Sequence, residues 1–139
     1  MEGKSGKRIY RILLVEDDPQ LLKTTNDLLK IKGYQVTTAA CGEMAIEAME
    51  KESFDLVVTD LIMGELNGLA VLKKAKELEP NRTVLIITGS LDVKHAIEAI
   101  RHDVDDYLLK PYRVNELLKR VSHCLEKGKS QHNNCRSVA

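Results

Sequence analysis

The sequence lacks a net charge, a long apolar run and the signal-peptide pattern of a secreted chain. Its 21 basic and 21 acidic residues give a formal net charge of zero, which argues against a surface made to bind nucleic acid or an anionic membrane. No apolar run approaches the roughly 18 residues of a membrane-spanning helix. The polar start MEGKSGKRIYR does not fit a signal peptide. We therefore expect a cytoplasmic protein without direct contact to nucleic acid or membrane.

Paired-cysteine motifs are also missing. The three cysteines, Cys41, Cys124 and Cys135, are odd in number and widely spaced, and none forms a CxxC motif. A disulfide framework and a structural zinc site are therefore disfavoured, and reduced thiols are expected. The chain has 139 residues, of which 43% are hydrophobic and 30% charged. This composition is typical of one globular domain with a hydrophobic core.

Five short apolar segments alternate with five amphipathic segments. The apolar segments predict strands at 9–15, 34–39, 54–60, 83–88 and 106–109. The stripes that predict helices lie at 21–29, 45–49, 69–75, 93–100 and 114–125. Consecutive Val, Ile and Leu residues in the third and fourth strands are typical of parallel strands covered on both faces. The alternation predicts a doubly wound α/β fold, with right-handed crossovers and helices on both faces of a parallel sheet.

The ends of the chain differ from this pattern. We expect a domain over residues 9–126, preceded by an N-terminal tail at 1–8. The segment KGKSQHNNCRSVA, residues 127–139, is polar and has no hydrophobic period. It is therefore expected to be a loose C-terminal tail or a truncated linker.

Charge is concentrated where the predicted strands end. In LLVEDDP, residues 13–19, three apolar residues lead directly into three carboxylates. At about 4 Å and an effective dielectric of about 20, each pair of like charges costs on the order of 4 kcal/mol. In open α/β sheets the functional crevice lies at the carboxyl ends of the strands. The ends of the other strands bring Asp60, Thr88 and Lys110 to that edge. Carboxylates are the ligands that Mg²⁺ prefers, and a bound cation would remove the repulsion.

Four segments resemble the signature segments of response-regulator receiver domains. They are ILLVEDDP, VVTDLIMGELNG, IITGS and DYLLKP, and they occur in the family's order. The resemblance as a whole covers residues 9 to about 126. The resemblance implies a flavodoxin-like (βα)5 three-layer sandwich with strand order 2-1-3-4-5. It also implies a two-component signalling module that is phosphorylated by a sensor histidine kinase or a histidine phosphotransfer protein. Such a module catalyses only its own phosphorylation and dephosphorylation, so it is not an enzyme in the ordinary sense.

The resemblance also assigns the chemistry of the site. Asp60 corresponds to the phosphoacceptor, whose carboxylate forms an acyl phosphate. Lys110 would pair first with Asp60 and then with a phosphoryl oxygen. A Mg²⁺ ion would neutralise charge on the phosphoryl group. Its ligands would be Glu16 through water, Asp17, Asp60 and the backbone carbonyl of Ile62.

Further residues match the family's switch. The hydroxyl of Thr88 would move onto the phosphoryl group, and Gly89 beside it has no side chain to block access. Tyr107 would turn inward and so change the surface formed by the fourth helix, the fifth strand and the fifth helix. That surface would act on a partner or an output domain, or form a phosphorylation-dependent homodimer. The Lys110–Pro111 peptide bond is expected to be cis.

Residues near the motifs both agree with and depart from the family pattern. Asp18 falls outside the acidic pair and, followed by Pro19, is placed to cap the first helix. Gly68 is retained eight residues after Asp60. Gly64 stands where the family usually has proline, and Asp103 stands where a glycine is usual.

Three other functions fit the sequence less well. A pseudo-receiver would act only through protein contacts, but the acidic pair, Asp60, Thr88 and Lys110 are all present. A flavodoxin-like nucleotide or flavin binder would need a phosphate-binding loop after the first strand, where the chain has EDDP. A haloacid-dehalogenase-like phosphatase would need a second aspartate at position 62, which is Ile62.

Ile62 leads to a first prediction about phosphoryl lifetime. In the family, the position two residues after the phosphoacceptor influences how water reaches the acyl phosphate. An isoleucine cannot orient a water molecule, so we expect slow self-dephosphorylation. Replacing Ile62 with Asn or Glu should shorten the lifetime of the phosphorylated protein, followed by intact mass over time. An unchanged lifetime would refute this role.

Overall fold

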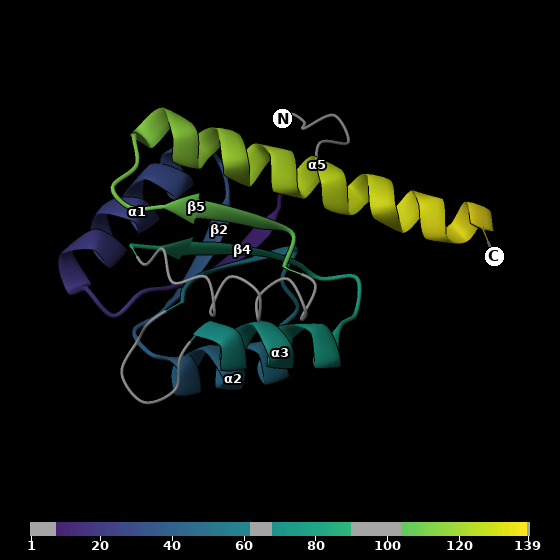
Figure 1. The fold of residues 1–139 in the computed structure, drawn as a ribbon, viewed down its shortest axis with the longest axis horizontal. Coiled ribbons are helices and arrows are strands. Elements are labelled where there is room, and N and C mark those ends of the chain that lie inside the picture. The colour runs from purple at the N-terminus through teal and green to yellow at the C-terminus, as the bar shows by residue number, and fades with distance from the viewer. Residues whose placement is uncertain (1–7, 62–67, 90–103, 139) are drawn as a thin grey trace.

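The computed structural model describes residues 8–61, 68–89 and 104–138, with side chains described as far as residue 126 (Figure 1). Five strands and four helices are found in these ranges. In chain order they are β1 (Arg11–Val15), α1 (Pro19–Ile31), β2 (Gln35–Ala39), α2 (Gly42–Lys51), β3 (Leu56–Asp60), α3 (Gly68–Leu78), β4 (Thr83–Thr88), β5 (Asp106–Leu109) and α5 (Val114–Val138). The expected helix at 93–100 lies outside the described residues, as do Ile62, Gly64 and Asp103.

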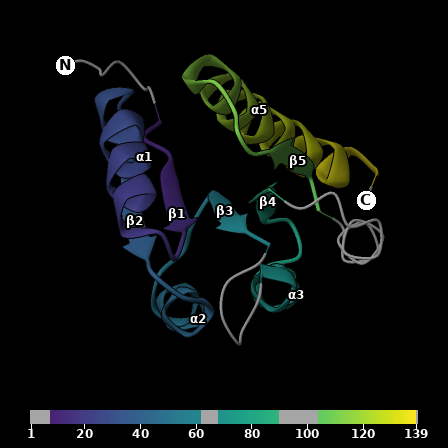
Figure 2. The same ribbon diagram turned by 60° about the vertical axis from the view of Figure 1, so that its left-hand side comes forward.

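The strands form one parallel sheet in the order β2-β1-β3-β4-β5, which confirms the predicted topology. Helices α1 and α5 cover one face of the sheet, and α2 and α3 cover the other (Figures 1 and 2). Every residue of β3 and β4 is buried. This explains why these two strands read as unbroken apolar runs, since each face meets a helical layer.

Alternate strand residues enter two separate cores. The core toward α2 and α3 includes Leu13, Val57, Val84, Ile86, Met49 and Leu72. The core toward α1 and α5 includes Ile12, Leu14, Val58, Leu85, Leu29 and Leu117. Apolar contacts therefore cover both faces of the sheet, and polar side chains gather at the ends of its strands.

Helix α1 begins where the sequence predicts. The Asp18 carboxylate accepts hydrogen bonds from the backbone N–H groups of Gln20 at 3.0 Å and Leu21 at 3.3 Å. Pro19 occupies the first helical turn, where its missing N–H costs nothing. Gly33 follows the helix with a φ of +97°, a conformation that glycine adopts without steric cost. The capping role predicted for Asp18 is confirmed.

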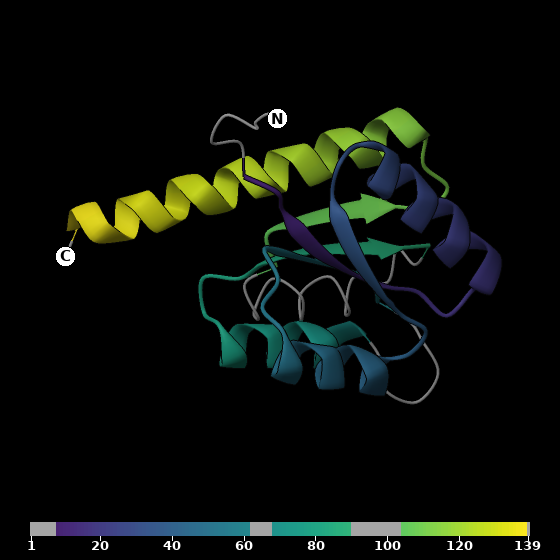
Figure 3. The ribbon, with the colours of Figure 1, turned by 180° about the vertical axis from the view of Figure 1, so that it is seen from behind.

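The C-terminal segment differs from the prediction. Residues 127–138 continue α5 as one helix to Val138 and do not form an irregular tail, and this end of the helix extends past the sheet (Figure 3). The buried turns of α5 before residue 126 supply the helix nucleus. After nucleation, each added residue gains a backbone hydrogen bond without a further nucleation cost. Polar residues can therefore prolong a helix without packing on the core. The domain boundary at residue 126 stays a prediction.

None of the helices in the described ranges combines the length and the apolarity that crossing a membrane requires.

Gly68, the first residue of α3, packs directly on the end of β3. A Cβ atom at this position would lie 2.0 Å from the carbonyl oxygen of Asp60 and 2.7 Å from the Cα of Leu61. The Gly68 N–H also donates a 2.8 Å hydrogen bond to the Leu61 carbonyl. The start of α3 is thus fixed against the backbone of the strand that carries Asp60.

This contact predicts that Gly68→Ala destabilises the protein. The methyl group must displace backbone, and overpacking of this kind costs about 1–3 kcal/mol. Gly89→Ala is the matched control, because among the described residues its Cβ would meet the Lys110 Cβ at 3.8 Å, an ordinary contact. Urea unfolding should show a lower midpoint for Gly68→Ala and a nearly unchanged one for Gly89→Ala. Equal midpoints would contradict this reading.

Candidate functional site

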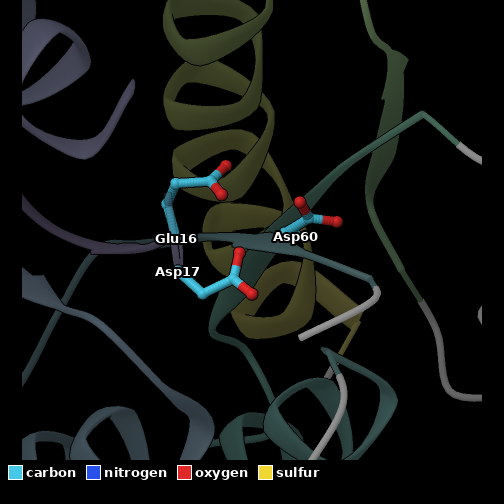
Figure 4. Close-up of side chains that lie close together, drawn as sticks. All are labelled: Glu16, Asp17 and Asp60. Carbon is cyan, nitrogen blue, oxygen red and sulfur yellow. The ribbon is translucent and has the colours of Figure 1, made fainter. Parts of the chain in front are cut away.

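Side chains from four strands meet at the carboxyl edge of the sheet. Glu16 and Asp17 follow β1, and Asp60 ends β3. One carboxylate oxygen from each lies within 4.8 Å of the others, and Figure 4 shows the three side chains gathered in one place. Thr88 ends β4, and Lys110 follows β5. The convergence expected from parallel topology is present.

Lys110 connects two of the carboxylates. Its ammonium donates to Asp60 Oδ2 at 2.7 Å and to Glu16 Oε1 at 2.9 Å. The second oxygen of Glu16 accepts the N–H of Asp18 at 3.1 Å. The backbone N–H of Lys110 donates to the Thr88 carbonyl at 2.8 Å, which fixes the end of β5 beside β4. The pairing of Lys110 with Asp60 agrees with the family resemblance, while that with Glu16 was not foreseen.

Burial makes these charges costly. Glu16 and Asp60 are buried, whereas Asp17 is exposed. Burial raises the pKa of Glu16, and the charge of Asp60 adds to this. Hydrogen bonds from Lys110 and the Asp18 N–H only partly offset the rise. Burial also lowers the pKa of Lys110, but hydrogen bonds and charge from Asp60 and Glu16 outweigh it, and the net pKa lies above the ordinary value. Lys110 is therefore cationic at neutral pH.

The donor set fits a divalent cation. Among the described side chains, the cluster has three carboxylates and one ammonium, which pairs with two of them, so negative charge is in excess. All three offer hard oxygen ligands, and the exposed Asp17 gives access from solvent. Mg²⁺ typically binds to one or two carboxylates and retains several waters. The edge of the sheet could hold such an ion, with Ile62, the fourth expected ligand, outside the described residues.

The residues expected to switch lie close to this cluster. Thr88 is buried and pairs in register with Leu109, next to Lys110. Tyr107 is partly buried against the core that faces α2 and α3. The Lys110–Pro111 peptide bond is cis, as predicted. Against the described residues, a methyl group at Gly89 would make an ordinary 3.8 Å contact with the Lys110 Cβ.

Sequence reasoning missed a small cavity behind Asp60. Thr25 of α1 and Tyr112 line it together with Glu16, Thr59 and Asp60, and its volume of about 10 Å³ is close to that of one water molecule. A signal was available in the sequence. Thr25 places a hydroxyl within the apolar stripe of α1, and its place in that stripe indicates that the hydroxyl faces the core.

Comparison with known proteins agrees with this geometry. The family model "Response regulator receiver domain" matches residues 12–122. The chain is 40% identical over 114 residues to the transcriptional regulatory protein ZraR of Escherichia coli K12, covering 82% of this chain and 26% of ZraR. It is 30% identical over 127 residues to the probable transcriptional regulator ycf27 of Cyanidium caldarium, covering 91% of this chain and 51% of ycf27. The chain thus spans between a quarter and about half of these relatives.

A solved structure has the same fold. The CheY-like response regulator receiver domain protein of Methanospirillum hungatei JF-1 superposes with a TM-score of 0.86 at 27% sequence identity. The match covers 89% of this chain and 99% of that one.

The excess of negative charge predicts that Mg²⁺ stabilises the protein. At a free Mg²⁺ concentration tenfold above Kd, binding to the folded state alone adds about 1.4 kcal/mol, or about 4–6 °C in Tm for a domain of this size. Thermal melts with and without Mg²⁺ measure the shift. Asp17→Asn, at an exposed position, should remove most of the response. A wild-type Tm that does not change when Mg²⁺ is added would contradict a cation site.

Proposed function

Because the chain belongs to the response regulator receiver family, we propose that Asp60 accepts a phosphoryl group from a phosphohistidine. The donor would be a sensor histidine kinase or a histidine phosphotransfer protein. The observation that carries this proposal is the 2.7 Å contact of the Lys110 ammonium with Asp60 beside the carboxylates of Glu16 and Asp17. It supports a site that brings a nucleophilic carboxylate, a cation site and a fixed positive charge together.

The transfer follows from these roles. A carboxylate oxygen of Asp60 forms a bond to phosphorus while the bond from phosphorus to the donor histidine nitrogen breaks, and the nitrogen keeps the electron pair. Glu16, Asp17, Asp60 and the Ile62 carbonyl would hold Mg²⁺, which supplies charge neutralisation for the phosphoryl oxygens. Lys110 places a second positive charge next to Asp60, and it stays in position to bind the acyl phosphate formed there.

The conformational change that follows phosphorylation would be transmitted through β4 and β5. Thr88 lies at the site and pairs in register with Leu109, two residues after Tyr107. Movement of the Thr88 hydroxyl onto the phosphoryl group would let Tyr107 repack and change the surface that includes β5 and α5. This surface would act on a partner, on an output domain or on a second copy of the chain. The transcriptional regulators that the chain resembles are longer proteins, so DNA binding would belong to an output domain.

A phosphorylation-independent interaction module is the less favoured alternative. A module that never takes phosphate has no need for a buried carboxylate paired with a partly buried ammonium, because such groups cost desolvation energy. Asp60, Glu16 and Lys110 are arranged in this costly way. The arrangement therefore favours the phosphoacceptor function.

Phosphorylation can be tested directly by intact mass. Incubation with Mg²⁺ and a small phosphodonor such as acetyl phosphate should add the mass of one phosphoryl group. Asp60→Asn should abolish the gain, because an amide cannot form the acyl phosphate. Asp27→Asn, at an exposed position of α1, is the matched control and should keep it. No mass gain, or a gain that survives Asp60→Asn, would refute the proposed function.

A further inference from the structure

Arg82 is a buried cation at the end of the sheet opposite the acidic cluster. It stands in the connection between α3 and β4, directly before the first residue of β4. The residue is only 5% exposed, and the Nε and Nη1 atoms of its guanidinium are buried with no hydrogen-bond partner among the described residues. Arginine is almost never fully buried unless it is paired, because a desolvated charge is costly. Arg82 therefore lacks the compensation that a buried charge ordinarily has.

Three carboxylates at this end of the sheet already have cationic partners. They form the ion pairs Arg8–Asp55, Arg11–Glu52 and Lys76–Asp105. Asp105 also accepts the Val84 N–H at 2.8 Å, and Asp55 accepts the Arg11 N–H at 2.8 Å. Their oxygens are thus used within the fold. Among these described groups, the positive charge of Arg82 is left over.

Glu79 is the nearby acid that acts on Arg82 without pairing with it. Burial lowers the pKa of Arg82, and the charge of Glu79 offsets this fall only in part. Glu79 is exposed, so solvent and salt screen its charge. It forms no ion pair with Arg82 in the described part of the chain. Glu79 therefore reduces the cost of burying the guanidinium but does not supply the missing hydrogen bonds.

The connection that carries Arg82 is held by its backbone. The Arg82 N–H donates to the Glu79 carbonyl at 2.9 Å, and the Lys76 ammonium donates to the Arg82 carbonyl at 2.6 Å. Neither contact involves the guanidinium. Residues 78–81 before it are all exposed, and exposed turns open locally at small cost in free energy. A small ion can thus reach the guanidinium while the backbone of Arg82 keeps its place.

The unpaired charge limits which ion fits. The planar donors of a guanidinium match the two oxygens of a carboxylate. One positive charge neutralises a monoanion, whereas a dianion would leave a negative charge buried without compensation. Lys76 cannot provide a second charge, because its ammonium is directed to Asp105 and to the Arg82 carbonyl. A small monocarboxylate therefore fits better than sulfate.

We propose that Arg82 forms an anion-binding site at the amino end of β4, which takes a small carboxylate anion. The carboxylate accepts hydrogen bonds from the guanidinium and neutralises its charge. Arg82 and Asp60 lie at opposite ends of the sheet, so this site does not depend on the proposed function. A ligand that binds only the folded state stabilises it by mass action. The site therefore couples the stability of the domain to the concentration of carboxylate.

Nuclear magnetic resonance tests the site with acetate as the probe. In the ¹⁵N-labelled full chain, the Nε–H signal of Arg82 is assigned by its loss in Arg82→Leu. Sodium acetate should move this signal to a saturating value. Sodium chloride and sodium sulfate at the same ionic strength should move it less. The signal of Arg113, an exposed arginine of the same chain, should stay in place.

Thermal melts of matched variants test the role of the guanidinium. Acetate should raise the Tm of the wild type and of Arg113→Leu, and leave that of Arg82→Leu unchanged. Arg82→Leu should remain folded, because replacing a buried charge with an apolar side chain is often neutral or stabilising. Arg82→Lys keeps the charge but loses the planar donors. Its half-saturating acetate concentration should rise about tenfold, the size of one lost charge-assisted hydrogen bond.

Four outcomes would overturn the proposal. Acetate leaves the Arg82 signal in place, or it raises the Tm of Arg82→Leu as much as that of the wild type. A response to acetate that occurs in Glu79→Gln but not in the wild type would show that Glu79 is the partner of Arg82 in solution. Sulfate binding more tightly than acetate would overturn the assignment to a monocarboxylate.

Discussion

The contact of one ammonium with two buried carboxylates is the interaction on which the edge of this sheet depends. Glu16, Asp60 and Lys110 are far apart in the sequence, and they meet only because β1, β3 and β5 run parallel in one sheet. Burying ions costs free energy that their attraction only partly returns. Apolar packing on both faces of β3 and β4 provides the stability that lets the chain keep such a cluster.

At the amino ends of the strands, several described carboxylates are paired with cations. There, Lys76 pairs with Asp105 at 2.8 Å, and Asp105 also accepts the Val84 N–H at 2.8 Å. Arg11 pairs with Glu52 near the start of β1. These carboxylates have cationic partners and stabilise the entry of strands into the sheet. Among the described side chains at the carboxyl edge, one ammonium pairs with two carboxylates of a cluster of three. This excess of negative charge distinguishes the binding edge from the structural one.

Much of the fold could be predicted because its signals are local. Strands buried on both faces are mostly apolar, which made β3 and β4 visible in the sequence, and Asp18 and Pro19 marked the start of α1. Parallel topology then placed the strand ends together. The helical path of residues 127–138 was missed, because helix propagation needs no apolar period. The contact of Glu16 with Lys110 was missed for another reason. It depends on how two long side chains bend, and no sequence pattern encodes that.

The close packing of Gly68 on β3 has a consequence for the segment between them. Residues 62–67 connect two points that are already joined by the hydrogen bond from Gly68 to Leu61. Because the ends of this connection are held by contacts outside it, its length and composition can vary at the modest entropic cost of closing a loop. A substitution within this stretch of the sequence, such as Gly64 in place of the family's usual proline, therefore need not move Asp60 itself. The position of Asp60 is thereby held by contacts on either side of the segment and not by the segment alone.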